Sequence, residues 1–199
     1  AVSSKFVEEI RGLAIGAEIS FEDAVLCQVR AEATHTVDEA CTAFALTGEA
    51  TLNQSTILGQ NQDLEPEYEN VAVLLRVTPD DGRPSALMFT FAGQLGYSGM
   101  NDRGIAHFAN AIYGIPWQPG SPHYPVKRAL LEQTSIGKVM KLLGSTAFCS
   151  AANMVIADAC GHIADVEIMP GTVSTFVDDH PDKRIHANHY QSPELDGRD

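Results

Sequence analysis

Residues 41–46, Cys-Thr-Ala-Phe-Ala-Leu, are followed after a polar turn by residues 55–63, Ser-Thr-Ile-Leu-Gly-Gln-Asn-Gln-Asp. The two runs predict a β-hairpin whose first strand begins at a cysteine and whose second strand ends at a carboxylate. A thiol at the start of a strand lies at the rim of a sheet, where a substrate can reach it. We therefore interpret Cys41 as a candidate nucleophile.

Strands and helices are segregated in the rest of the sequence. Apolar residues at helical spacing predict helices over residues 4–18 and 20–33, before the hairpin, and two more after a proline-rich loop at 114–124. Further strands are predicted at residues 71–77, 86–91, 105–111, 150–157, 163–168, 172–177 and 184–190. This segregation favours the α+β class, as an αββα four-layer sandwich of stacked, mainly antiparallel sheets in a single domain, residues 1–199.

The composition argues against two classes of partner. Lys and Arg total 13 against 26 Asp and Glu, a net charge of -13, so we expect no nucleic-acid partner. No apolar run approaches the ~20 residues that span a bilayer, so we expect no membrane partner.

The cysteines bear on the redox compartment. Cys27, Cys41, Cys149 and Cys160 lie far apart in sequence without a Cys-x-x-Cys pair, and the N-terminus shows no signal-peptide pattern. We therefore expect reduced thiols and a cytoplasmic location, while two disulfides stay an open alternative.

Cys41 has two competing interpretations. A cysteine is most often a small buried apolar side chain. Its position between a charged helical section and a β-rich body favours a nucleophile, although only His35 lies nearby in sequence as a base. The α-amino group of Cys41, with a pKa near ~8, can act as the base once the bond to Ala40 is broken. The small, polar flank 37–40 suits such a cleavable connection.

Asp63 ends the second strand of the same hairpin. Because neighbouring strands lie about 4.8 Å apart, its carboxylate can orient a group at the start of the first strand. An exposed loop carboxylate beside Glu65 and Glu67 is the alternative interpretation.

His186 and His189 form a His-x-x-His pattern found in some metal sites. Residues three apart on a strand point to opposite faces, so we expect no metal and no cofactor. Asn188 is the better candidate, because a neutral amide N–H can stabilise an oxyanion. Asn110 has the same interpretation, and a structural role is the alternative for both.

An ordered set of short motifs resembles a known family. The motifs are Glu8-Glu9-Ile10-Arg11-Gly12-Leu13-Ala14-x-Gly16-Ala17, Arg30-x-Glu32, Cys41-Thr42, Gly59-Gln60-Asn61-x-Asp63, Asn101-x-x-Gly104 and His186-x-Asn188-His189. Over about residues 5–190 the chain resembles the acyl-coenzyme A:6-aminopenicillanic acid acyltransferase family, whose members are N-terminal-nucleophile hydrolases made as precursors.

The resemblance implies an αββα sandwich and autocatalytic cleavage between Ala40 and Cys41, giving an α segment (1–40) and a β segment (41–199). It implies that Cys41 attacks an amide or thioester carbonyl with its freed amine as base, that Asp63 supports the amine, and that Asn188 helps hold the oxyanion. The resulting acyl-cysteine passes its acyl group to water or to an amine.

Substrate and partner expectations follow from the same resemblance. We expect Thr42, Asn61 and Asn110 to contact a small-molecule amide or acyl-thioester substrate. The cleaved α and β subunits are expected to associate, and a homo-oligomer is left open.

Two departures from the family leave alternatives. The best-known member cuts after glycine, whereas this chain has Ala40 before the cysteine. Members also carry extra sequence before the helix at Glu8 and after Asn188, and the later segment contains an Ile-Cys-Arg motif. We expect this chain to lack both extra segments. Choline-glycine hydrolases, which cut conjugated bile salts or phenoxymethylpenicillin, are the nearest alternative, but they carry an arginine shortly after the cysteine and here none precedes Arg76. A non-catalytic protein that keeps the sandwich as a scaffold or binding module is the alternative from another class.

Overall fold

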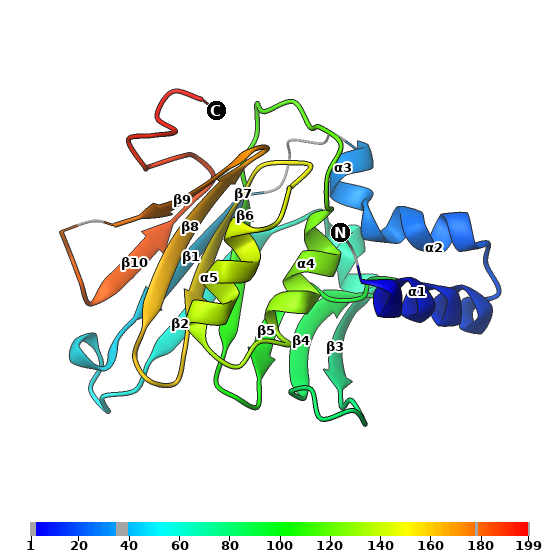
Figure 1. Ribbon diagram of the computed structural model, residues 1–199, viewed down its shortest axis with the longest axis horizontal. Helices are drawn as coiled ribbons and strands as arrows, with labels where there is room; N and C mark the ends of the chain where they lie inside the picture. Colours follow the sequence, from blue (N-terminus) through cyan, green and yellow to red (C-terminus); the bar gives the residue numbers. More distant parts are fainter. Residues whose placement is uncertain (1–2, 35–39, 178, 199) are drawn as a thin grey trace.

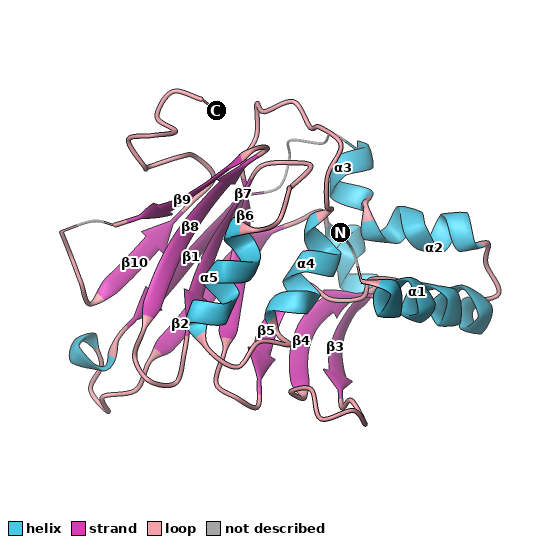
Figure 2. Cartoon of the chain, viewed as in Figure 1, coloured by secondary structure: helices cyan, strands magenta, loops and turns pink. Residues whose placement is uncertain are grey.

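The computed structural model describes residues 3–34, 40–177 and 179–198. Figure 2 shows how its helices and strands follow one another. In chain order they are α1 (Ser4–Ala17), α2 (Phe21–Gln28), α3 (Arg30–Thr34), β1 (Ala40–Leu46), η1 (Gly48–Ala50), β2 (Ile57–Asp63), η2 (Pro66–Asn70), β3 (Ala72–Val77), β4 (Ala86–Phe91), β5 (Ser98–Asn101), β6 (Ala106–Ala111), α4 (His123–Leu130), α5 (Ile136–Gly144), β7 (Ala152–Ala157), β8 (Ile163–Met169), β9 (Thr172–Phe176) and β10 (Lys183–His186). None of the helices in these ranges is long and apolar enough to cross a membrane.

The strands form two antiparallel sheets (Figure 1), a small one in the order β10-β1-β2 and a large one in the order β3-β4-β5-β6-β7-β8-β9. The predicted hairpin is confirmed, with Cys41 opposite Gln62. The other neighbour of β1 is β10, where His186 lies opposite Ala43. The far end of the chain is thereby placed beside the hairpin.

The large sheet is covered on both faces. On one face, α4 and α5 bury Leu130 and Leu143 against Met154 of β7. On the other, the small sheet buries Ala43 against Val155. Since Met154 and Val155 are consecutive, their side chains point to opposite faces, and the predicted α+β class with stacked antiparallel sheets is confirmed.

The N-terminal helices lie beside the large sheet rather than over the small one (Figure 1). Phe6 and Ile10 of α1 and Ala24 of α2 pack in one cluster with Leu95, because these apolar helix faces find their partner at the β4–β5 connection. Within the described ranges no helix covers the outer face of the small sheet, where Thr42 is exposed. The described residues therefore form three of the four expected layers, namely the α4 and α5 helices, the large sheet and the small sheet.

Two details differ from the sequence prediction. The helix predicted over residues 20–33 ends at Gln28 and is followed by the separate helix α3. A 3.0 Å hydrogen bond from the Asp23 N–H to Ser20 Oγ caps its N-terminus. Strand β5 was not predicted because its glycines resembled an interruption. A Cβ on Gly99 would lie 2.2 Å from the carbonyl oxygen of Leu87, so this close approach of β4 and β5 requires glycine.

Candidate active site

The layer between the two sheets is apolar at one end and polar at the other. Ala43, Ala45 and Val155 form the apolar end. The polar end consists of the side chains of Cys41, Gln60, Gln62, Asn110, Asn153, Asp165, Glu167 and His186. Buried polar and titratable groups gathered in one place are typical of functional sites, so the polar end is the candidate active site.

The thiol of Cys41 faces this polar end. Cys41 is only 4% exposed and lies on the same side of β1 as the buried Ala43, whereas the intervening Thr42 is exposed. Gln62, opposite Cys41 across the hairpin, donates from its amide to the hydroxyl of Tyr97 in the β4–β5 connection. The start of β1 is thus joined to the large sheet by polar contacts.

Asn188 lies directly over the backbone of Cys41. The Cys41 N–H donates to Asn188 Oδ1 at 2.7 Å, and Asn188 Nδ2 donates to the carbonyl oxygen of Ala111 at 2.7 Å. An amide nitrogen carries two N–H groups, so Nδ2 keeps a second donor beyond the bond to Ala111. The structure therefore brings Cys41 and Asn188 together, and their catalytic roles remain predictions.

Asp63 lies opposite the residue that precedes Cys41. It is opposite Ala40 in the hairpin register, and its side chain is exposed. Neighbouring strands lie about 4.8 Å apart, so the backbone of Asp63 lies beside that of Ala40. Strand alternation puts its side chain on the outer face of the small sheet, as for Asn61. His35 and residues 37–39 of the predicted cleavable flank lie outside the described residues.

The three residues predicted to contact substrate lie in two different places. Thr42 and Asn61 are opposite one another, and both are exposed on the outer face of the small sheet. Asn110 is 1% exposed, and its amide donates to Asn153 Oδ1 at 2.9 Å and to the His186 carbonyl at 3.1 Å. Asn110 Oδ1 accepts from Gln60 at 3.2 Å. Burial favours a supporting role for Asn110, while Thr42 and Asn61 point away from the thiol.

Two carboxylates of β8 belong to the polar end, and sequence reasoning missed both. Glu167 accepts a 2.8 Å hydrogen bond from Nε2 of His186, and both side chains are fully buried. Asp165, equally buried, accepts from the amide of Asn153. The available signal was the alternation of charged and apolar residues in 163–168, an otherwise apolar run.

The environment sets the charge of these groups. Burial alone would raise the pKa of Glu167, but hydrogen bonds from His186, Ser192 and Gln191 outweigh it and lower the pKa. Burial opposes the charge of His186 as well, yet Glu167 and Asp165 raise its pKa above the usual value. The pair is therefore an ion pair, Glu167 negative and His186 positive.

The predicted orientation of the two C-terminal histidines is wrong. The rings of His186 and His189 are stacked, with centroids 6.3 Å apart. The reason is that β10 ends at His186, so strand alternation no longer applies at His189. Across the described ranges no group of three His, Cys, Asp or Glu side chains is placed to hold a metal ion.

The other cysteines are poor nucleophile candidates. The four thiols, all within the described ranges, form no disulfide with one another. Burial and the nearby Glu32 raise the pKa of Cys149 to about 11, so its thiol stays protonated. Cys160 is exposed on the β7–β8 turn, and Cys27 is partly buried on α2.

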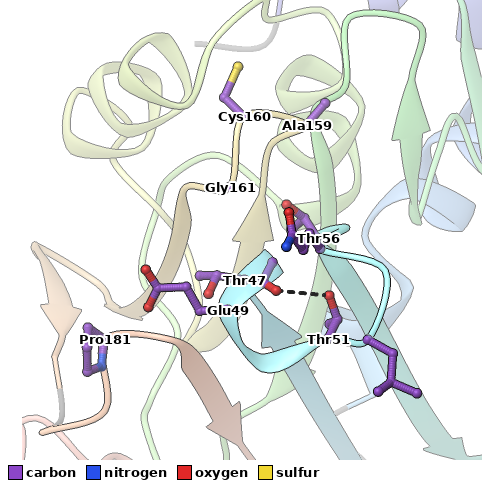
Figure 3. Close-up of a pocket in the computed structure, with 11 residues that line it drawn as sticks. Thr47, Glu49, Thr51, Thr56, Ala159, Cys160, Gly161 and Pro181 are labelled. Atoms are coloured by element: carbon purple, nitrogen blue, oxygen red, sulfur yellow. Dashed lines mark hydrogen bonds between the residues drawn. The ribbon is translucent and has the colours of Figure 1, made fainter.

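A separate cavity of about 780 Å³ lies at the opposite end of β1 (Figure 3). Thr47, Thr51 and Thr56 line it, together with Cys160. Seven residues of strand separate the two ends of β1, roughly 20 Å at about 3.4 Å per residue. A single carboxylate, Glu49, also lines the cavity. Buried titratable groups gather beside Cys41 instead, so the polar end remains the candidate active site.

Comparison with known sequences finds a matching protein family. The family described as acyl-coenzyme A:6-aminopenicillanic acid acyl-transferase matches residues 50–198. A curated relative from Emericella nidulans, the acyl-coenzyme A:6-aminopenicillanic-acid-acyltransferase 40 kDa form, is 28% identical over 191 residues, covering 93% of this chain and 52% of the relative. The chain thus spans about half the length of this curated relative.

Solved structures support the fold. The Caenorhabditis elegans ortholog of N-acylethanolamine-hydrolyzing acid amidase superposes with a TM-score of 0.61 at 15% identity, covering 76% of this chain and 71% of that one. At this identity the likeness shows the fold alone. Penicillin V acylase from Agrobacterium tumefaciens superposes less well, with a TM-score of 0.39 at 16% identity, over 76% of this chain and 42% of that one.

Proposed function

Since the chain belongs to the acyl-coenzyme A:6-aminopenicillanic acid acyl-transferase family, we propose that it is an autoprocessing amide hydrolase or acyltransferase with Cys41 as its N-terminal nucleophile. Cleavage of the Ala40–Cys41 bond creates the catalytic amine. The enzyme then acts on an N-acyl amide or acyl thioester through an acyl-cysteine intermediate, and no cofactor takes part.

One observation carries this proposal: the 2.7 Å hydrogen bond from the Cys41 N–H to Asn188 Oδ1. It places a neutral amide against the nitrogen that becomes the α-amine after cleavage. The second N–H of the same amide is a suitable donor for an oxyanion that forms beside the thiol. Cys41 and Asn188 are thereby held as one unit, with Asp63 opposite Ala40.

Processing requires two chemical steps. The Cys41 thiol attacks the carbonyl carbon of Ala40, the C–N bond breaks, and the thiol proton passes to the departing nitrogen. The products of this step are a thioester on sulfur and a free α-amine. Water then cleaves the thioester, leaving a carboxyl group on Ala40 and restoring the thiol. Asp63 supports the charge of the new amine.

Turnover uses the same groups. The free amine takes the thiol proton, and the sulfur attacks the acyl carbonyl while Asn188 donates to the oxyanion. The ammonium returns its proton to the leaving group as the carbon–nitrogen or carbon–sulfur bond breaks. Water or an acceptor amine then attacks the acyl-cysteine and releases the acyl group.

The substrate class is proposed from the curated relative. Its name describes acyl transfer to 6-aminopenicillanic acid, a reaction that forms an N-acyl amide, so we assign this class to the polar end. Access of water or of an amine to the acyl-cysteine decides between hydrolysis and transfer.

The two segments are proposed to stay together after cleavage. The Gln28 amide donates to the Gly93 carbonyl at 2.6 Å and accepts from the Leu95 N–H at 2.9 Å. Glu32 accepts from the His123 N–H and from Ser150 Oγ, each at 3.2 Å. These buried bonds join residues 1–40 to residues 41–199 without the peptide bond. The absence of a disulfide among the four thiols supports a cytoplasmic site of action.

Intact-mass spectrometry of the purified protein tests the proposal. The wild type is expected to appear as fragments of 40 and 159 residues, and Cys41→Ala as one intact chain, because the attacking sulfur is absent. Cys160→Ser, which changes an exposed thiol outside the site, is the matched control and should be cleaved like the wild type. An intact chain in both wild type and Cys41→Ala would refute the proposal.

A further inference from the structure

Glu167 contacts one short stretch of the chain repeatedly. Its carboxylate accepts from His186 Nε2 at 2.8 Å, from the Gln191 N–H at 2.5 Å and from the Ser192 N–H at 3.0 and 3.2 Å. The three donors bracket Asn188. A single carboxylate of β8 therefore holds both ends of the segment that carries the proposed oxyanion donor.

Other contacts hold the same segment, residues 186–192. The carbonyl of His186 accepts from Asn110 at 3.1 Å, and Nδ1 of His186 lies 2.9 Å from the carbonyl oxygen of Ala187. The Tyr190 hydroxyl donates to the carbonyl of Ile168 at 2.8 Å. The segment leaves β10 and is fixed to β6 and β8 of the large sheet before and after Asn188.

The ring of His186 faces an acceptor at each nitrogen, the carboxylate of Glu167 and the carbonyl of Ala187. Only the doubly protonated ring donates to both. Two buried charges lose their hydration, and a well-packed apolar pair is often as stable or more stable. Stability alone therefore explains this ion pair poorly. Fixing the geometry of the 186–192 segment explains it better.

We propose that Glu167 and His186 are positioning residues, which hold the 186–192 segment so that Asn188 stays on the Cys41 nitrogen. This role rests on the proposed function, because it matters for the reaction only if Cys41 and Asn188 carry it. Neither residue touches the substrate. A displacement of about 1 Å at a reacting group can cost on the order of 100-fold in rate, so loosening this segment slows the chemistry.

Glu167→Gln tests the role directly. The amide retains the shape of the carboxylate, but it removes the negative charge opposite His186. With its oxygen in the place of Oε1, its NH₂ group faces the Ser192 N–H, which donated to Oε2. We expect self-cleavage of the freshly made chain to slow roughly 10- to 100-fold, measured by intact mass during cell-free synthesis. Amide hydrogen exchange in residues 187–192 should rise by about the same factor. The second measurement does not depend on any activity.

Glu132→Gln is the matched control. It makes the same change of side chain at another part-buried carboxylate, but Glu132 accepts hydrogen bonds from Lys5 and Arg83 rather than from the 186–192 segment. We expect its self-cleavage to stay within about twofold of wild type. Melting temperatures of both variants show whether lost stability explains any difference.

A conservative pair at His186 separates positioning from packing. His186→Gln places an N–H near the former Nε2 and can still donate to Glu167, whereas the shorter His186→Asn cannot reach it. We expect His186→Gln to cleave at least about fivefold faster than His186→Asn. Equal rates for the pair, a wild-type rate for Glu167→Gln, or equal slowing by Glu132→Gln would overturn the role.

The two proposals fail in distinguishable ways. A wild-type chain that stays intact refutes the proposed function, and hydrogen exchange then decides alone whether Glu167 holds the segment. Unchanged exchange in Glu167→Gln overturns the positioning role, even where the wild type is cleaved.

Discussion

Asp165 and Glu167 lie two residues apart on β8, both fully buried, and their pKa values move in opposite directions. Burial raises the pKa of Asp165 to about 6, despite the attraction of His186 and the hydrogen bond from Asn153. Glu167 has three donors in place of one, and its pKa is lowered. The additional donors to Glu167 outweigh the effect of burial on its pKa, whereas the single donor to Asp165 does not.

The raised pKa of Asp165 makes stability depend on pH. The native state binds this proton more tightly than the unfolded state, so stability falls as pH rises from about 4 towards about 6 and stays lower above. Asn at this position carries no titratable proton, so Asp165→Asn should remove this fall, up to about 3 kcal/mol. Urea midpoints of both proteins between pH 4 and pH 8 measure it.

Glu167→Gln should change the pH dependence of stability in the opposite direction. The lowered pKa of Glu167 stabilises the native state above about pH 4.5, and this contribution is lost as pH falls further. The Gln variant should therefore lose stability relative to wild type at neutral pH and approach it in acid. Parallel pH profiles for Asp165→Asn and wild type would contradict the assignment.

At the scale of elements, α2 and α3 connect the N-terminal section to the body. Both helices are short, and an isolated helix of this length is marginal in water. Their buried polar side chains, Gln28 and Glu32, hydrogen-bond to groups beyond the proposed cut. The helices are thus held mainly by contacts with residues 41–199. A fragment that stays bound without a covalent link needs such contacts.

Gln28→Ala is expected to weaken this attachment. It leaves the buried Leu95 N–H and the part-buried Gly93 carbonyl without their partner, at a cost of about 1–3 kcal/mol. The 40-residue fragment should then dissociate from the cleaved protein roughly tenfold more readily, since about 1.4 kcal/mol is a factor of ten. Size-exclusion chromatography of diluted, cleaved protein measures the loss.

Glu22→Ala on the same helix is the control. Glu22 is exposed, so its removal should change fragment retention by less than about 0.5 kcal/mol. Equal retention of the fragment in Gln28→Ala and Glu22→Ala would show that the amide does not hold the segments together.

At the scale of the whole molecule, the site joins residues 147 positions apart, Cys41 and Asn188. The small sheet depends on the same closure, because β10 pairs with β1. Cleavage that requires Asn188 cannot begin until the C-terminal strand has docked. We therefore expect the proposed processing to follow docking of β10.

Chains stalled on the ribosome with only residues 1–182 outside the exit tunnel should stay uncleaved, because they lack β10 and Asn188. After release of the complete chain, cleavage should begin, and gel electrophoresis of the labelled product follows it over time. The Cys41→Ala chain, carried through the same protocol, accounts for background proteolysis. Cleavage of the stalled wild-type chain at the wild-type rate would show that Asn188 is dispensable.

Much of this architecture was predictable because local patterns specify it. Strand alternation and turn residues predicted the hairpin, and its register follows from them. The roles of Cys41, Asp63 and Asn188 remain predictions, but the structure places these residues around one peptide bond.

The remaining features depend on contacts between distant elements. The Glu167–His186 pair joins two different sheets, and no local pattern specifies how sheets stack. The outward direction of Thr42, by contrast, follows from alternation once Cys41 points inward. The position of α1 depends on Leu95, which lies in a connection without sequence periodicity.

The contacts of α1 to α3 across the proposed cut have one further consequence, for recovery from denaturation. The uncut chain refolds as one molecule, at a rate that does not depend on its concentration. Once the Ala40–Cys41 bond is hydrolysed, residues 1–40 and 41–199 must find each other again, so renaturation becomes a bimolecular reaction. Dilution then slows reassociation of the two segments. The stability of the cleaved protein is therefore kinetic, because it depends on how slowly the protein unfolds rather than on how readily it refolds.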